Sequence, residues 1–599
     1  MSASRITKSP GFLTSFVLTA AAVAVPLHAD VAIARGGRAE ARILVAADAS
    51  ETERFAASEL ALFLHLVTGG DFAVATEAGG LAGSRLFVGA GAVRAADPSF
   101  PTDLAAEEFA VTAKGSDLLL AGGSPRGTLY AVYSFLEDVV GCRWWTRTAS
   151  TIPSKPNLRL AGFSFRSKPA FEYREPFWYE AFDPVWAARN KANGIQAGGG
   201  DREGGRQVYE GFVHTFYVLI PPEKYFAQHP EWFSEIKGQR TTEHAQLCLT
   251  NEEMRRELTE NLRRLLRKNP KATIASVSQN DCQGFCTCPA CRAVDAEEGG
   301  PAGSLLRFVN TVAADLEAEF PNVAIDTLAY QYSRKPPRLV RPRPNVIVRL
   351  CSIECSFARP LDDPHNKAFF DDLRGWAAIA GRLYIWDYTT NFSHYVQPHP
   401  NYPVLAPNLR LFAANSVRGV FEQGAYQSWG SEMAELRSWT LAKLLWNPGL
   451  DPARLRREFL EGYYGRAAGN VEDYLSLMEK AVAHAGDALG CYSPTEAKFL
   501  SLDVLRRGWD ILEAAEHKAR LDEYRRRVRI ARLPVAYVIL SRWDDLRKQA
   551  GSSEAAWLWG SDRAALLTWF LESARKEGLT KISEWQDFED WAAKGGKRK

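Results

Sequence analysis

Strand-like runs alternate with helical patterns from Phe171 to Tyr426, and this rhythm constrains the fold of the 599-residue chain more than any other feature. The runs are short and rich in β-branched and aromatic residues, and amphipathic stretches such as EEMRRELTENLRRLLRKNP separate them. Roughly eight such units over about 250 residues have the size of a (β/α)8 TIM-like barrel. A doubly wound open sheet is the alternative, but it usually has a glycine-rich first turn, and this sequence shows none.

Eight runs carry this prediction. They are FEYREPFWYE, GFVHTFYVLIPP, QLCLTN, ATIASVSQND, VAIDTLAYQYS, NVIVRLCSIECS, RLYIWDYTTNF and VRGVFEQGAY. The flanks differ: residues 30–167 mix strand patterns with two helices, in ETERFAASELALFLHLVTGG and in GGSPRGTLYAVYSFLE, and strand signals almost disappear after residue 450. We therefore expect an α/β protein with a small α/β domain at 30–167, a barrel at 168–450 and an α-helical domain at 451–599.

The first 29 residues have the pattern of a signal peptide. Arg5 and Lys8 precede an apolar run from Phe12 to Leu27, and cleavage is expected after Ala29. No later segment of about 20 apolar residues follows, so we expect no membrane span in the mature protein. The expected location is the periplasm or the medium.

Charge and aromatic content narrow the class of partner. The net charge is only +2, and Lys and Arg are spread along the chain, which argues against nucleic acid. Aromatic residues make up 11% of the chain, with 17 Trp, which suits stacking against sugar rings, although burial in a large core explains many of them. An oligosaccharide or a glycoprotein glycan is the expected partner; the oligomeric state is left open.

Four acids end predicted strands. Asp281, which follows Asn280, ends the run ATIASVSQND, and Glu354, Asp387 and Glu422 interrupt later runs. A carboxylate in an apolar run is costly unless it faces a polar cavity or a partner, and glycoside hydrolysis needs two carboxylates at one barrel face. The alternative for each acid is a structural ion pair, with Arg349 and Arg382 as nearby partners.

Aromatic and hydrogen-bonding residues accompany these acids. The candidates for sugar contacts are His214, Tyr330, Trp386 and Tyr388. Rings that simply fill the mouth of the barrel are the alternative. The histidines form no recognisable metal motif, so we expect no catalytic metal and no cofactor.

Four cysteines follow Asp281 within ten residues: Cys282, Cys286, Cys288 and Cys291. Their spacing allows a structural zinc site, but it lacks the distant second pair of a zinc ribbon, and export favours disulfides. We therefore favour disulfides and keep zinc open. In either case the cysteines are expected to hold the loop that carries Asp281.

Two parts of the chain resemble known families. GGSPRGTLYAVYSFLE, followed by Gly141, Arg143 and Trp144, resembles the accessory domain that precedes the barrel in hexosaminidases and α-glucuronidases. SQNDCQGFCTCPAC, HPEWFSEIKGQR, LYIWDYTTNF and VFEQGAYQSWGSEMAELRSWTLAKLLWNP resemble the bacterial domain of unknown function numbered 4838, part of which forms glycoside hydrolase family 163. The second resemblance implies an endo-β-N-acetylglucosaminidase that acts on complex N-glycans.

The resemblance also implies a mechanism. In a retaining, substrate-assisted reaction the acetamido oxygen of the substrate attacks the anomeric carbon, so the protein supplies a general acid/base and a carboxylate that orients the acetamido group. We expect Glu354 as the acid/base and Asp281, helped by Asn280, as the orienting carboxylate, with the reversed roles left open. His214, Asp387, Tyr388 and Glu422 are expected in the subsite wall.

Two other functions remain open at this stage. A barrel hydrolase acting on uronic acids or other polysaccharide oligomers would use Arg349 or Arg382 to bind a substrate carboxylate. A glycan-binding protein without hydrolysis would keep the aromatic residues, but the four acids argue against it.

Overall fold

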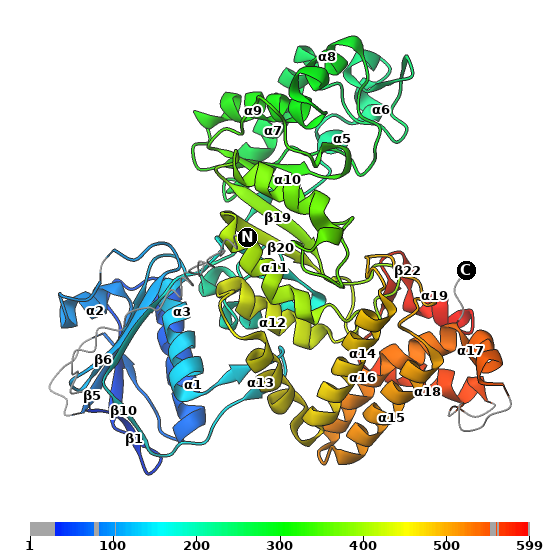
Figure 1. The fold of residues 1–599 in the computed structure, drawn as a ribbon. Helices are drawn as coiled ribbons and strands as arrows, with labels where there is room; N and C mark the ends of the chain where they lie inside the picture. Colours follow the sequence, from blue (N-terminus) through cyan, green and yellow to red (C-terminus); the bar gives the residue numbers. More distant parts are fainter. Residues whose placement is uncertain are drawn as a thin grey trace, which may run out of the picture.

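The computed structural model describes residues 30–76, 83–101, 103–551, 557, 559 and 562–596. The expected signal peptide lies outside the described residues. An α/β unit (blue and cyan) and a group of long helices (orange and red) flank a central parallel sheet with its own helices (green and yellow) (Figure 1). None of the helices in the described part combines the length and the apolar character that a bilayer-spanning segment needs.

The N-terminal unit is built on a six-stranded mixed sheet of order β11-β6-β7-β5-β3-β4. These strands are Phe163–Ser167, Phe109–Lys114, Asp117–Gly122, Ser84–Val88, Ala41–Leu44 and Val74–Ala75. Helix α1 (Glu51–Thr68) begins with a capping box, in which Ser50 and Glu53 satisfy each other's backbone N–H groups. Helices α1 and α3 (Gly127–Ser134) pack together and place their apolar side chains in the core of this unit.

The central sheet contains seven parallel strands in the order β12-β20-β19-β18-β17-β16-β13. They are Tyr173–Phe177, Val417–Gln423, Leu383–Tyr388, Val346–Cys351, Ala324–Ala329, Ile274–Ser276 and Tyr209–Glu210. The rings of Tyr173 and Tyr209, on the two outermost strands, have centroids only 6.1 Å apart. The sheet is therefore strongly curled. The result is a curled half-barrel in a mixed α/β protein.

An irregular segment bridges the two edges of the half-barrel. Asn193 exchanges hydrogen bonds with the backbone of Arg174 on β12, at 2.9 and 3.2 Å, and its carbonyl accepts a 2.9 Å hydrogen bond from Gln207 N–H beside β13. Backbone pairing at this opening is therefore supplied by residues around Asn193 and not by a regular strand.

Two of the predicted strand runs are not strands themselves. GFVHTFYVLIPP contains the short helix α5 (Phe216–Leu219), and the strand of this section, β13, lies directly before it. QLCLTN forms only an isolated bridge between Leu247 and Phe233, and the N–H of Cys248 bonds the carbonyl of Trp232 at 2.8 Å. Both runs are apolar because they pack against neighbouring loops and helices, and a short apolar run does not distinguish that packing from a strand.

Helices cover the outside of the half-barrel. They are α7 (Glu252–Lys268), α8 (Pro289–Glu298), α9 (Ala302–Glu317), α10 (Lys367–Ala377), α11 (Tyr402–Ala414) and α12 (Ala434–Trp446). Asn251 caps α7 by accepting a hydrogen bond from Met254 N–H. One continuous apolar core joins these helices, except α8, to the sheet and to the helices that follow, and α8 packs on α9.

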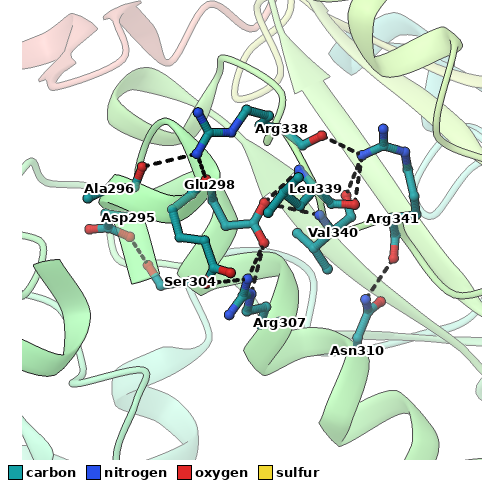
Figure 2. Close-up of polar contacts among 11 residues, drawn as sticks. Asp295, Ala296, Glu298, Ser304, Arg307, Asn310, Arg338, Leu339, Val340 and Arg341 are labelled. Atoms are coloured by element: carbon teal, nitrogen blue, oxygen red, sulfur yellow. Dashed lines mark hydrogen bonds and ion pairs between the residues drawn. The ribbon is translucent and has the colours of Figure 1, made fainter. Parts of the chain in front are cut away.

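Glu298, at the end of α8, fastens the connection between β17 and β18 (Figure 2). Its buried carboxylate accepts hydrogen bonds from the N–H groups of Leu339 and Val340 at 2.8 and 3.0 Å and from Arg307 of α9. Burial alone would raise the pKa of Glu298, but these donors outweigh it and the pKa is lowered. Helices α8 and α9 and the 338–340 segment are therefore held as one unit.

Buried ion pairs join the N-terminal unit to the half-barrel. Glu107 pairs with Arg174 of β12 at 2.8 Å, and Glu137 pairs with Lys191 at 3.1 Å and with Lys443 of α12. Burial opposes ionisation of Glu137, but the charges of Lys443, Lys191 and Arg143 outweigh burial and lower its pKa to about 2. These contacts fix how the accessory unit sits against the sheet.

The C-terminal part is mainly helical. Its helices are α13 (Pro452–Tyr464), α14 (Ala468–Ala485), α15 (Leu502–Lys518), α16 (Asp522–Ser541), α17 (Trp543–Ala550), α18 (Arg563–Lys576) and α19 (Phe588–Ala593). Helices α13 to α16 pack against one another in sequence, and α17 and α18 pack on α16. The expectation of helices alone misses one element: a hairpin of β21 (Lys581–Ser583) and β22 (Gln586–Asp587). This hairpin returns to the half-barrel, where Tyr395 N–H bonds the carbonyl of Ile582 at 3.0 Å.

Candidate active site

A cavity of about 250 Å³ lies at the carboxyl ends of strands β17 to β20. This is the edge where parallel-sheet enzymes hold their reactive groups. The lining residues are Val213, His214, Asp281, Leu328, Tyr330, Cys351, Ile353, Trp386, Tyr388, Phe392, Gln423, Tyr426, Tyr492 and Glu584. Its two carboxylates are far apart in sequence: Asp281 lies in the loop after β16, and Glu584 lies in the C-terminal hairpin.

Asp281 is held by an aromatic hydroxyl. The hydroxyl of Tyr330, just beyond β17, donates a 3.1 Å hydrogen bond to Asp281 Oδ1, and Gln331 Nε2 donates to the same hydroxyl oxygen at 2.8 Å. Burial and the neighbouring carboxylate raise the pKa of Tyr330 above its usual value, so its hydroxyl keeps its proton. The carboxylate therefore faces the cavity with its orientation set by Tyr330.

Glu584 occupies the turn between β21 and β22. Its N–H bonds the carbonyl of Phe392 at 2.9 Å, and the Tyr426 hydroxyl donates to its Oε1 at 3.2 Å. Burial raises the pKa of Glu584, the hydrogen bond from Tyr426 opposes that rise, and the charge of Asp281 adds to it. A carboxyl group with a raised pKa beside a second carboxylate has the properties of a general acid.

The sequence prediction missed Glu584. It stands in LTKISEWQDF, which shows neither a strand pattern nor a long apolar run, and it lies far from the barrel in sequence. The nearest signal is the adjacent Trp585, because an exposed Trp beside an acid is an uncommon choice for a surface turn.

His214 lines the cavity in a strained backbone conformation. Its φ of 56° lies in the left-handed region, which costs a non-glycine residue about 1–3 kcal/mol. Its Nδ1 lies 2.7 Å from the carbonyl oxygen of Gln279 and must donate to it, because a carbonyl only accepts. This hydrogen bond fixes the ring at the wall of the cavity that His214 lines.

Aromatic side chains form the wall and the mouth. Trp386 and Tyr388 line the cavity as predicted, and Trp386 Nε1 donates to Gln423 Oε1 at 2.7 Å. At the mouth, the rings of Tyr492 and Trp585 stack with centroids 6.0 Å apart and an interplanar angle of 29°. These two residues are 51% and 63% exposed, so their apolar faces are open to a ligand.

Glu354, the expected acid/base, does not line the cavity. Its side chain is 44% exposed and pairs with Arg334 at 2.9 Å, and Arg334 also pairs with Asp372 at 2.8 Å. Ile353, the preceding residue, does line the cavity, so Glu354 points away at the rim. β18 ends at Cys351, and Glu354 lies in the turn that follows, where its carboxylate pairs with Arg334.

Asp387 and Glu422, predicted in the subsite wall, lie on the opposite face of the sheet. They are paired in register on β19 and β20, while their neighbours Trp386, Tyr388 and Gln423 line the cavity. Asp387 accepts hydrogen bonds from Ser352 Oγ and from Asn408 of α11. Burial raises the pKa of Asp387 to about 6, and burial together with the Asp387 charge raises that of Glu422 well above its usual value.

Asn280 and Arg349 also have internal roles in place of the predicted contacts with substrate. Asn280 joins two loops: its N–H bonds Gln246 Oε1 at 2.8 Å and its Nδ2 bonds the Ala245 carbonyl at 2.9 Å. Arg349 is fully buried inside the half-barrel, where it pairs with Asp326 at 2.9 Å and contacts the ring of Phe212. Neither residue reaches the cavity lining.

The cysteine cluster also differs from the prediction. Cys286, Cys288 and Cys291 gather with Cys248, which precedes α7, while Cys282 stays outside the group and approaches the Ala245 carbonyl. All nine cysteines of the chain lie within the described residues and none forms a disulfide.

A larger cavity of about 660 Å³ lies between α11, α12, α13 and α14. Two of its three carboxylates are already paired, since Arg456 binds Glu472 at 2.7 Å and also binds Glu479. It contains no pair of carboxylates free of a cation, so we place the reactive centre in the smaller cavity at the strand ends.

Comparison with known proteins identifies the family of the chain. Residues 144–476 match the family model DUF4838, described as a domain of unknown function, over more than half of the chain. The chain belongs to the DUF4838 family. The matched span contains Asp281, Tyr330, Trp386 and Tyr426 but ends before Tyr492 and Glu584. The cavity of this DUF4838 protein is thus completed by residues beyond the family model.

Solved structures similar to this DUF4838 chain are glycoside hydrolases. BtGH115A, a family GH115 4-O-methyl-α-glucuronidase with specificity for decorated arabinogalactans, has 12% identity and a TM-score of 0.58, covering 93% of this chain and 79% of its own. A family 89 glycoside hydrolase from Clostridium perfringens has 10% identity and a TM-score of 0.48, covering 88% and 66%. No curated protein matches the chain. At these identities the likeness concerns the fold.

Proposed function

We propose that this protein is an exported glycoside hydrolase that cleaves a neutral, N-acetylated sugar from a complex glycan, as a substrate-assisted, retaining β-N-acetylglucosaminidase. The observation that carries the proposal is that Asp281 and Glu584 line one aromatic cavity at the strand ends, close enough for the Asp281 charge to raise the pKa of Glu584. Acid-assisted glycoside cleavage requires one carboxyl group that donates a proton and a second carboxylate at the same site.

The two acids take different roles in this proposal. Glu584, whose pKa is raised, protonates the leaving oxygen and then accepts a proton from water. Asp281, oriented by Tyr330, accepts a hydrogen bond from the acetamido N–H, so that the acetamido oxygen is aimed at the anomeric carbon. His214 and Trp386, which line the cavity, position the sugar. Glu584 thus replaces Glu354 as the proposed acid/base.

The charge of the lining argues for a neutral sugar. No Arg or Lys is found among the lining residues, all of which belong to the described part of the chain. A uronidase needs a cation to bind the substrate carboxylate, and Arg349 and Arg382 are engaged with Asp326 and Glu172. The uronic acid alternative is therefore disfavoured, although the fold is shared with a glucuronidase.

The domain plan belongs to the same proposal. The half-barrel at 168–450 acts as a variant (β/α)8 barrel in which the segment around Asn193 stands in for a missing strand. The 30–167 unit is its accessory domain, and the 451–599 region supplies Glu584 to the cavity. Export through the signal peptide and membership of glycoside hydrolase family 163 are parts of this proposal.

A substrate panel tests the function. The protein is incubated with complex N-glycans, with aryl β-N-acetylglucosaminides and with aryl α-glucuronides, and new reducing ends are measured. We expect release from the N-acetylated substrates only, and a fall of at least ~100-fold in D281N. Release from glucuronides alone, or binding of glycans without any new reducing end, would reject the proposal.

A further inference from the structure

Four cysteine sulfurs converge below the loop that carries Asp281. Cys248, Cys286, Cys288 and Cys291 are all buried, and their sulfur atoms lie within 4.8 Å of one another. Cys248 Sγ lies 3.8 Å from Cys288 Sγ and 3.9 Å from Cys291 Sγ. Two segments contribute, because Cys248 precedes α7 while the other three lie before and at the start of α8.

These spacings fit a tetrahedral metal site better than disulfides. Zinc–sulfur bonds of about 2.3 Å place the sulfurs of a tetrahedron roughly 3.8 Å apart. A disulfide requires about 2.05 Å between two sulfurs and would separate the four into pairs. The separations of Cys248 from Cys288 and from Cys291 are nearly equal and match the tetrahedral edge.

The surroundings of the sulfurs suit bound thiolates. Glu235 N–H points at Cys286 Sγ at 3.3 Å, and Arg240 Nη1 lies 3.6 Å from the same sulfur. The Thr250 hydroxyl lies 3.2 Å from Cys291 Sγ. Four thiolates on one Zn²⁺ leave a net charge of about −2, which a guanidinium and N–H or O–H donors around the ligands stabilise.

We propose that Cys248, Cys286, Cys288 and Cys291 bind one structural Zn²⁺ ion. Four protein ligands close the tetrahedron and leave no position for a substrate, so the metal has no part in the chemistry. Gln246, two residues before Cys248, donates through Nε2 to the carbonyls of Asn280 at 2.9 Å and Cys282 at 2.8 Å. The metal therefore anchors the loop that presents Asp281.

Metal content of the full chain tests the site without reference to activity. Elemental analysis of purified protein is expected to give about one zinc per chain. C288S and C291S are expected to lose at least about 90% of it, and C282S, a matched control outside the cluster, is expected to keep it. Full zinc content in C288S and C291S would overturn the proposal.

Two measurements on the wild-type protein cover the case in which the serine variants fail to fold. Replacement of zinc by Co²⁺ is expected to give thiolate charge-transfer absorption and the visible bands of a tetrahedral site. Intact mass after denaturation is expected to show nine thiols. A metal-free protein whose mass is lower by about two units per disulfide, with bridges among these four cysteines, would overturn the proposal.

Discussion

The hydroxyl of Tyr426 donates a hydrogen bond to Glu584 across 3.2 Å and joins the end of β20 to a hairpin 158 residues further along the chain. This contact brings a carboxyl group from the C-terminal region into the cavity of the half-barrel. It also lowers the pKa of Glu584 against the rise caused by burial.

The Tyr426 contact leads to a prediction about pH dependence. If Glu584 is the general acid, turnover falls as pH rises through its pKa. Y426F removes a hydrogen bond that stabilises the charged form, so the alkaline limb of kcat is expected to move to higher pH. In D281N the alkaline limb of the residual activity is expected to move to lower pH, because the Asp281 charge that raises the pKa of Glu584 is removed. The check is a pH–rate profile for both variants; shifts in the same direction would contradict the assignment.

The stacked pair Tyr492 and Trp585 is expected to bind the part of the glycan beyond the cleaved sugar. Loss of one aromatic face costs about 0.5–1.5 kcal/mol, so W585A should raise KM for an oligosaccharide by roughly 2- to 12-fold. Trp585 is not among the residues that line the cavity, so the KM for an aryl glycoside with one sugar serves as the control. An equal rise in KM for both substrates would show that Trp585 supports the structure of the site and does not bind the glycan.

Asp387 and Glu422 are expected to control stability instead of chemistry. Their pKa values are raised in the folded protein, so their stabilising contribution is complete below the unfolded pKa near 4 and is lost as pH rises through about 6 and above. E422Q removes the cost of a buried charge and should stabilise the protein by about 1–3 kcal/mol at pH 8, with little change at pH 4. Denaturant unfolding at the two pH values measures this, and turnover of E422Q should stay near that of the wild type.

The site could be predicted in part because parallel strands present their carboxyl ends at one edge. Asp281, Tyr330, Trp386 and Tyr388 follow from that rule and do line the cavity. The prediction that Asp387 and Glu422 lie in the subsite wall is wrong for a physical reason. All residues of β19 are buried, so its sequence shows no alternation that distinguishes the inner face from the outer one. Every second residue faces the helices, and both acids are among them.

The rest of the site depends on contacts between distant segments. Glu584 reaches the cavity because its hairpin bonds Phe392 and Tyr426, and Cys248 joins the cysteine cluster through the turn before α7. Neither pairing leaves a local pattern. The sequence predicts a (β/α)8 barrel of eight strands, whereas the structure has a half-barrel of seven parallel strands, and contacts of Asn193 bridge its two edges.

The turnover of E584Q compared with E354Q tests the central claim most directly. On the substrate that the panel identifies, E584Q is expected to lose at least ~100-fold in kcat, the scale of general acid–base catalysis, while its unfolding transition stays unchanged. E354Q, altered at an exposed rim position, is expected to stay within a few-fold of the wild type. Near-normal turnover in E584Q together with a collapse in E354Q would contradict the account.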